Sequence, residues 1–232
     1  MDAAAPLLVA ASDFFRGLSP AACRDVTERA RERRFARRAV LLRESESEPA
    51  LFLLVAGRVK LGKLGSNGQE VILQLLGAGD VFGGVAALAG GPSPATVQAV
   101  EAGRALVWDR PVLRELVARY PEIAVNGVRI AAARMQEIQE RFRELSTERV
   151  AQRIARTLLR LARQAGRRVE GGVLLDLPLP RRDLAEMTGT TLYTVSRTLS
   201  EWSERGLLET RRGRLLLRAP HALVAIAEDL GG

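Results

Sequence analysis

A polar helix face near the C-terminus carries the side chains with the most informative chemistry. Tyr193, Ser196, Arg197 and Ser200 fall on one side of an expected helix, and no acid occurs there before Glu201. Hydroxyl groups donate and accept hydrogen bonds, and a guanidinium matches the O6 and N7 acceptors of guanine bidentately. Such a face can approach DNA without charge repulsion and reach base edges in the major groove.

Two short helices joined by a tight turn are expected to position this face. The first runs from about Arg181 to Thr188 and ends at Gly189, since a tight turn between helices needs a residue that tolerates positive φ. Thr190 or Thr191 would cap the second helix. That helix is predicted to bury apolar residues at i, i+4 and i+7, which are Val195, Leu199 and Trp202.

A β-hairpin is expected directly after the second helix. Residues 207–217 have the pattern of two short strands that turn at Arg212 and Gly213. Arg211, Arg212 and Arg214 would contact phosphates, which position a protein on DNA without reading its sequence. The helices and the hairpin together predict a winged helix-turn-helix. The alternative is an ordinary helical hairpin with a solvated arginine cluster.

Residues 40–108 have the pattern of a small all-β domain. Glycine-rich turns separate six short apolar runs, at Val40–Leu42, Leu51–Val55, Val59–Leu61, Val71–Leu76, Thr96–Val100 and Ala105–Trp108. The pair Asn67 and Gly68 between two of these runs is a strong hairpin signal. Many short strands with such turns are typical of an antiparallel barrel or sandwich.

Helices are expected on both sides of the β region. Residues 13 to about 38 are predicted to be helical, with a break before Ser19, which is the expected N-cap. A short helix is predicted at Arg110–Tyr120, followed by a long one to about Leu145. Ser146 resembles a new helix N-terminus, so we place a domain boundary there and expect helix from about Thr147 to Ala165.

The long helix carries a heptad seam. Its apolar residues alternate steps of four and three, at Ala124, Val128, Ala131, Met135, Ile138, Phe142 and Leu145. A narrow a/d seam with charged flanks is typical of a coiled-coil dimer. We therefore predict homodimer contacts through Val128, Ala131, Met135, Ile138 and Phe142. The alternative is that the stripe packs on the β domain of its own chain.

The composition favours a nucleic-acid partner over catalysis. The formal net charge is +8, from 35 basic and 27 acidic residues, which favours a polyanionic partner, although an arginine-rich codon bias is an alternative cause. The single histidine, His221, excludes a metal site built on imidazoles, and no phosphate-binding or nucleophile-elbow motif occurs, so we expect no enzyme. One cysteine, Cys23, and the lack of a membrane-length apolar run predict a cytoplasmic protein without membrane association.

Residues 180–210 resemble the winged helix-turn-helix of the Crp/Fnr superfamily of bacterial transcription regulators. The matching stretches are Thr194–Arg197 with the following leucine, and Gly206–Leu208. Upstream, residues 51–60 and 79–83 are similar to the strands and glycine turns of its cyclic-nucleotide-type β-roll. The resemblance implies an α+β fold with three parts: an antiparallel, jelly-roll-like β-roll sensor domain at 1–120, a dimerisation helix at 121–145 and a winged helix-turn-helix at 146–232.

The resemblance also implies residue roles at the DNA. Arg197 would contact a guanine, Thr191 and Thr194 would contact phosphates, and Arg181 and Arg182 are candidate backbone contacts. Together with the polar face and the hairpin, the candidate DNA-binding residues are Arg181, Arg182, Thr191, Tyr193, Thr194, Ser196, Arg197, Arg211, Arg212 and Arg214. Common members carry a glutamate where this chain has Tyr193, and that carboxylate accepts from a cytosine amino group. One base pair of the half-site should therefore be read differently here.

The candidate effector pocket departs from the cyclic-AMP-binding members. Those members place a glutamate and an arginine on the ribose and the phosphate, at about the positions of Gly84 and Pro94 here. We therefore expect no response to cyclic AMP. The candidate pocket residues are Phe82, Gly83, Gly84, Pro94, Ala95 and Thr96. No cofactor or metal is expected. One cysteine cannot hold the iron–sulfur cluster of the family's oxygen sensors, and the one histidine lies outside the β region, where it could not bind a haem in that domain. The signal that the protein senses is unknown.

The patterns and the resemblance together predict a homodimeric, sequence-specific transcription regulator that binds a palindromic site in double-stranded DNA, and the resemblance implies that it contacts RNA polymerase. Two alternatives remain at the level of sequence. One is a sequence-neutral architectural DNA-binding protein. The other is a cupin-like metalloenzyme, which would need histidine ligands that the β region lacks.

Overall fold

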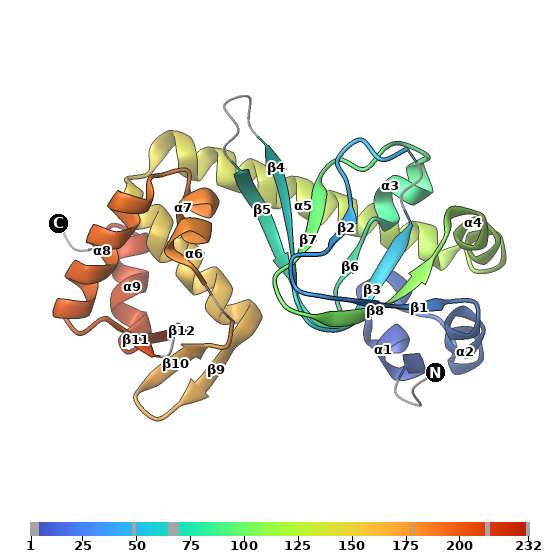
Figure 1. Cartoon of the computed structure of the whole chain (residues 1–232), viewed down its shortest axis with the longest axis horizontal. Helices are drawn as coiled ribbons and strands as arrows, with labels where there is room; N and C mark the ends of the chain where they lie inside the picture. Colours follow the sequence, from blue (N-terminus) through green and yellow to red (C-terminus); the bar gives the residue numbers. More distant parts are fainter. Residues whose placement is uncertain (1–4, 48–49, 65–69, 178, 212–213, 231–232) are drawn as a thin grey trace. The chain divides into compact units, whose positions relative to one another are not determined.

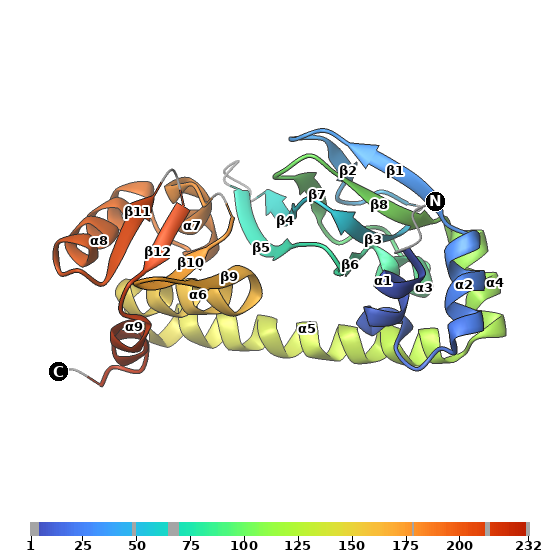
Figure 2. The same cartoon turned by 90° about the horizontal axis from the view of Figure 1, so that it is seen from below.

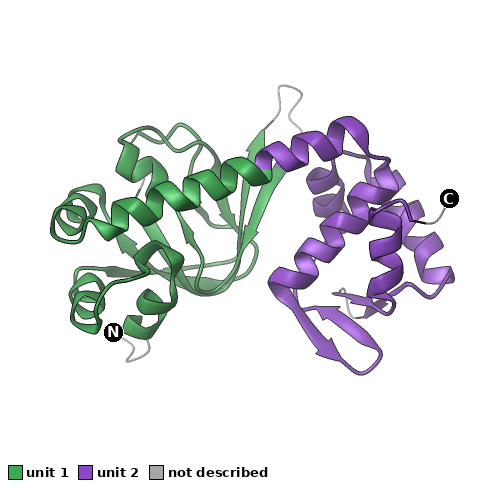
Figure 3. Cartoon of the chain, turned by 180° about the vertical axis from the view of Figure 1, so that it is seen from behind, with its two compact units in different colours: residues 1–65, 72–137 green, residues 66–71, 138–232 purple. Residues whose placement is uncertain are grey.

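A computed structural model describes residues 5–47, 50–64, 70–177, 179–211 and 214–230. The chain divides into two compact units, and the division falls within one long helix after Glu137 (Figure 3). The first unit holds the strands of the N-terminal half, and the second holds the helices and strands that follow residue 138. Buried apolar residues occur in both units, and those of the first unit form two clusters.

Two four-stranded sheets form the first unit (Figure 1). One has the order β1-β8-β3-β6 and the other the order β2-β7-β4-β5. The strands are β1 (Arg31–Phe35), β2 (Val40–Leu42), β3 (Leu51–Ala56), β4 (Val59–Leu64), β5 (Glu70–Leu76), β6 (Val81–Phe82), β7 (Thr96–Ala99) and β8 (Gly103–Trp108). All six predicted apolar runs are confirmed as strands, whereas the turn predicted at Asn67 and Gly68 lies outside the described residues.

Strand β3 shows why its sequence is apolar at successive positions. Leu51 and Leu53 pack into a core that is shared with the helices, while Phe52 and Leu54 pack into a second core together with residues of both sheets. A strand that is buried on both faces reads as a continuous apolar run rather than an alternating one. The ring of Phe52 stacks on Phe82 of β6 at 4.6 Å between centroids.

The helices of the first unit pack against one face of the sheet that contains β3 and β8 (Figure 2). They are α1 (Ala5–Ala11), the 3-10 turn η1 (Asp13–Phe15), α2 (Pro20–Glu28), α3 (Gly84–Ala89), α4 (Arg110–Arg119) and the first part of α5 (Glu122–Thr147). Ser19 is confirmed as the N-cap of α2, because its side chain accepts from the Ala22 amide at 3.2 Å. The buried side chain of Asn126 joins α5 to the N-terminal segment by donating to the Arg16 carbonyl at 2.8 Å.

The helix predicted from residue 13 to about 38 is wrong beyond Glu28. Residues Arg31–Phe35 instead form the edge strand β1, which pairs antiparallel with β8. Arginine and glutamate are good helix formers, so the local sequence favours a helix. Pairing with a distant strand and burial of Phe35 outweigh that preference.

The second unit surrounds the amphipathic helix α6. Its elements are α6 (Val150–Ala165), β9 (Gly166–Val169), β10 (Gly172–Leu175), α7 (Arg181–Thr188), α8 (Leu192–Glu204), β11 (Leu208–Arg211), β12 (Arg214–Leu217) and α9 (Pro220–Ala227). The strands form one sheet of order β11-β12-β10-β9. The hairpin of β9 and β10 was not predicted, although Gly171 and Gly172, both at positive φ, mark its turn.

The predicted helix start at Ser146 is also wrong. Ser146 and Thr147 belong to α5, and their hydroxyl groups donate to the carbonyls of Phe142 and Arg143, four residues back. Serine and threonine satisfy their hydroxyls in this way inside helices, so their presence does not by itself mark a cap. The helix α6 begins later, at Val150.

None of the helices in the described part of the chain combines the length and the apolar content that a membrane span requires.

A candidate nucleic-acid interface and a pocket in the first unit

The two-helix motif of the second unit is formed by α7 and α8. The helix α7 ends at Gly189, whose φ is +61°, so the predicted turn is confirmed. A Cβ atom at this position would come within 2.8 Å of Leu145 Cδ2. Thr191 rather than Thr190 caps α8, because its side chain accepts from the Thr194 amide at 3.1 Å.

The helix α8 separates a buried face from an exposed one. Val195, Leu199 and Trp202 are buried, as predicted. Tyr193 is 74% exposed and Arg197 is also exposed, four residues apart on the opposite face. The described residues provide no ion pair for Arg197, while the acid at the end of this face, Glu201, pairs with Arg205 at 3.5 Å. The exposed face therefore presents a cation and hydroxyl groups without a competing carboxylate.

The threonines at the start of α8 keep a donor for an external acceptor. The Oγ1 atoms of Thr191 and Thr194 lie 2.9 Å apart, and either hydroxyl can donate to the other. Whichever one donates, the second hydroxyl hydrogen stays available. Because it lies at a helix N-terminus, where the dipole favours anions, this pair can bind a phosphate oxygen.

The first helix of the motif presents its two leading arginines to solvent. Arg181 and Arg182 are both exposed at the start of α7. Arg182 is engaged within its own helix, since its Nε donates to Glu186 at 2.9 Å. Ser196 is half-buried, so it is the least accessible of the candidate base-reading side chains on α8.

The hairpin of β11 and β12 lies next to α8 (Figure 2). Arg211 pairs with Glu209 at 2.8 Å, and Arg214 forms an ion pair with Asp176. Hydrogen bonds from Arg211 and Arg218 lower the pKa of Glu209, so this carboxylate stays charged. The sequence reasoning missed these acids, which already pair with two of the three arginines that it proposed for phosphate contact. Arg212, also proposed for this role, lies outside the described residues.

The helix α5 bears a stripe of exposed apolar side chains. Val128 is 70% exposed, Met135 57%, Ile138 58% and Phe142 72%, while Ala131 is half-buried. Large apolar side chains exposed in a row along one helix mark an interaction site in soluble proteins. Their own chain therefore leaves more than half of each of these four large side chains uncovered, whereas Ala131 is partly covered.

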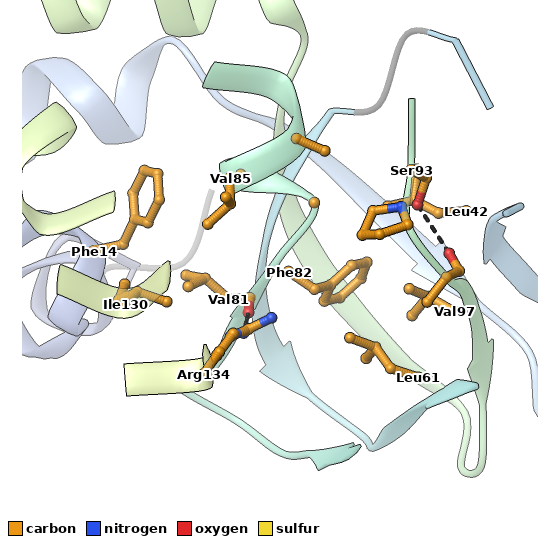
Figure 4. Close-up of a pocket in the computed structure, with 15 residues that line it drawn as sticks. Phe14, Leu42, Leu61, Val81, Phe82, Val85, Ser93, Val97, Ile130 and Arg134 are labelled. Carbon is orange, nitrogen blue, oxygen red and sulfur yellow. Dashed lines mark hydrogen bonds between the residues drawn. The ribbon is translucent and has the colours of Figure 1, made fainter. Parts of the chain in front are cut away.

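A small pocket of about 60 Å³ lies between β6, α3 and the segment around Pro94 (Figure 4). Phe82, Gly83, Gly84, Pro94 and Ala95 line it, as grouped by the sequence reasoning. Thr96 is not among the lining residues, and its hydroxyl accepts from the Glu44 amide at 3.1 Å. The sequence reasoning missed Arg134, which enters from α5 and donates to the Val81 carbonyl at 3.0 Å.

The single cysteine and the single histidine of the chain both lie outside the lining of this pocket. Cys23 is buried in α2, and burial raises the pKa of its thiol, which disfavours the reactive thiolate. His221 lies exposed at the start of α9 in the second unit. Neither residue is among those that line the pocket.

Comparisons with known proteins cover both units. Residues 32–120 match the cyclic nucleotide-binding domain family, and residues 152–226 match the Crp-like helix-turn-helix domain family. The chain is 30% identical over 219 residues to the cyclic AMP receptor protein of Thermus thermophilus, covering 94% of this chain and 98% of that protein. It is 27% identical over 210 residues to the CRP-like cAMP-activated global transcriptional regulator of Mycobacterium tuberculosis, covering 90% and 94%.

A solved structure shows the same fold. FixK2 from Bradyrhizobium japonicum superposes with a TM-score of 0.75 at 27% identity, covering 85% of this chain and 96% of that one.

Proposed function

Because the chain belongs to the Crp/Fnr family of transcription regulators, we propose that it acts as a homodimer that binds a palindromic DNA site through α8. We further propose that it does not respond to cyclic AMP. The observation that carries the proposal is the exposed face of α8. There Arg197 has no internal ion pair among the described residues and Tyr193 is 74% exposed. Buried Val195, Leu199 and Trp202 fix the orientation of that face.

The exposed stripe on α5 supports the dimer. Two copies that align this stripe would bury it in a coiled-coil seam, and a two-fold protein matches a palindromic site. We keep the proposed organisation of sensor domain at 1–120, dimerisation helix at 121–145 and DNA-binding domain at 146–232. A regulator of this family acts on transcription, so RNA polymerase is the further partner that we propose.

Selection of bound sites from random DNA tests the proposal. We expect the full-length protein to recover a palindrome, and a scrambled version of that site should bind about 10³–10⁷-fold more weakly. The reason is that phosphate contacts stabilise the complex with any DNA sequence, whereas base contacts from α8 add affinity only at the selected site. An architectural DNA-binding protein would bind the selected and the scrambled sites equally, and that result would refute sequence-specific reading.

Where cyclic-AMP-binding members would carry a glutamate and an arginine, this pocket has Gly84 and Pro94. A Cβ atom at Gly84 would come within 2.6 Å of Leu51 Cδ1 and 2.9 Å of Phe14 Cε2, so a glutamate there would have to displace these two buried side chains. Pro94 supplies no cation for a phosphate. The pocket therefore has neither the carboxylate for the ribose nor the arginine that the resemblance would place at these two positions.

Calorimetry with millimolar cyclic AMP should show no heat of binding, and the affinity for the selected DNA site should stay unchanged. The Thermus thermophilus cyclic AMP receptor protein, measured under the same conditions, is the positive control. A dissociation constant in the micromolar range for this chain would show that the nucleotide finds other partners and that the argument from Gly84 and Pro94 is wrong.

A further inference from the structure

The guanidinium of Arg134 stands in a pocket whose other lining side chains, apart from that of Ser93, are apolar. It enters from α5 and lies near Phe82 and Leu61, as Figure 4 shows. Among the described residues, the carbonyl of Val81 is the acceptor that its Nη2 reaches, at 3.0 Å. A guanidinium carries five N–H groups, so most of its donor capacity is not used by that bond.

The charge of Arg134 is only weakly compensated by its surroundings. Asp80 and Glu137 are the acids whose fields act on it, yet neither forms an ion pair with it in the described part of the chain. The Asp80 carboxylate instead accepts a hydrogen bond from the Gly77 amide, at 2.8 Å between N and Oδ2. Burial lowers the pKa of Arg134, which means that its charged form lacks part of the solvation that it would have in water.

The other polar group in the lining is used internally. Ser93 donates its hydroxyl to the Ala95 carbonyl at 2.8 Å. Phe14, Leu42, Val97 and Ile130 contribute apolar surface. A ligand rich in hydroxyl groups, or a phosphate with its hydrated oxygens, would leave polar atoms unpaired against these walls, at a cost for each.

We propose that this pocket binds a small carboxylic acid with an apolar chain or ring, whose carboxylate pairs with Arg134. The carboxylate accepts two parallel N–H bonds in the geometry that a guanidinium favours. The apolar part lies against Phe82 and Leu61. A volume of about 60 Å³ restricts the ligand to a compact acid unless the side chains at the rim move.

The position of Arg134 connects the pocket to the exposed stripe. Arg134 is followed directly by Met135, so a ligand on Arg134 contacts the helix that carries the proposed dimer seam. An effect of the bound acid on the dimer seam, and so on DNA binding, rests on the proposed function. The binding itself does not, because it is measured on the full-length protein without DNA, and DNA affinity is measured separately.

Calorimetry with a series of straight-chain carboxylates from acetate to octanoate, and with phenylacetate, tests the proposal. We expect saturable binding that tightens by about fourfold for each added methylene until the pocket is full. Primary alcohols of the same length, and inorganic phosphate, should bind at least tenfold more weakly. Equal binding of the alcohols, equal binding of phosphate, or no binding of any acid at millimolar concentration would overturn the proposal.

Variants on α5 locate the anchor. Arg134→Gln should weaken carboxylate binding at least tenfold, while Arg134→Lys should retain part of it. Arg129→Gln is the matched control, because Arg129 lies on the same helix, pairs with Asn126 Oδ1 at 3.2 Å and does not line the pocket. If Arg134→Gln does not fold, Leu61→Trp should exclude the longest acids first by filling the apolar end. Unchanged binding in a folded Arg134→Gln, or in Leu61→Trp, would refute the assignment.

Discussion

Replacing Met135 and Ile138 by glutamate should convert the protein to monomers that no longer hold a palindromic DNA site. The two side chains are 57% and 58% exposed in the single chain, so the substitutions leave its own core intact. In a coiled-coil seam they would bring four carboxylates together in an apolar interface, where desolvation and like-charge repulsion both oppose association.

Loss of the second half-site should weaken DNA binding by about 10²–10⁴, the gain that linked binding sites usually provide. Light scattering gives the oligomeric state, and fluorescence anisotropy with the selected site gives the affinity. The double variant Gln136→Glu, Gln139→Glu adds the same charge at exposed positions of the same helix outside the seam, and it should remain a dimer. A dimer of the seam variant with intact DNA binding would show that α5 is not the interface.

Replacing Tyr193 by glutamate should change which base pair is selected at one position of the half-site. The tyrosine hydroxyl donates and accepts, whereas a carboxylate only accepts and therefore matches the amino group of cytosine. A good base contact contributes about 1–3 kcal/mol of discrimination, which corresponds to roughly 5- to 150-fold between base pairs. Arg197, one turn further along α8, should keep its guanine in both proteins.

The substitution is structurally mild, which makes this comparison clean. Tyr193 is 74% exposed and occupies the second residue of α8, where the helix dipole favours an acid. Site selection from random DNA with both proteins is the measurement. Ser203→Glu adds the same charge at an exposed position near the other end of the helix and should leave the selected site unchanged. If wild type and Tyr193→Glu select the same strongly defined base pair, Tyr193 does not determine specificity.

The regular spacing of apolar residues explains why the exposed face of α8 could be predicted residue by residue. The spacing of Val195, Leu199 and Trp202 defines the buried side of α8 and so places Tyr193 and Arg197 opposite. The same reasoning identified the exposed stripe of α5. In both helices the relevant side chains come from a single element, and a helix places residues three and four apart on one face whatever surrounds it.

From the sequence we could therefore predict the six apolar strands of the first unit, the buried and exposed faces of α8 and α5, and the glycine turn at Gly189. Only the tertiary structure decided where the charged segment Arg31–Phe35 pairs, which acids hold Arg211 and Arg214, and that Arg134 of α5 enters the pocket beside Phe82. The physical reason is the range of the contacts. Local periodicity reports which face of an element is apolar, but pairing with a distant strand or carboxylate depends on three-dimensional packing that no local pattern records.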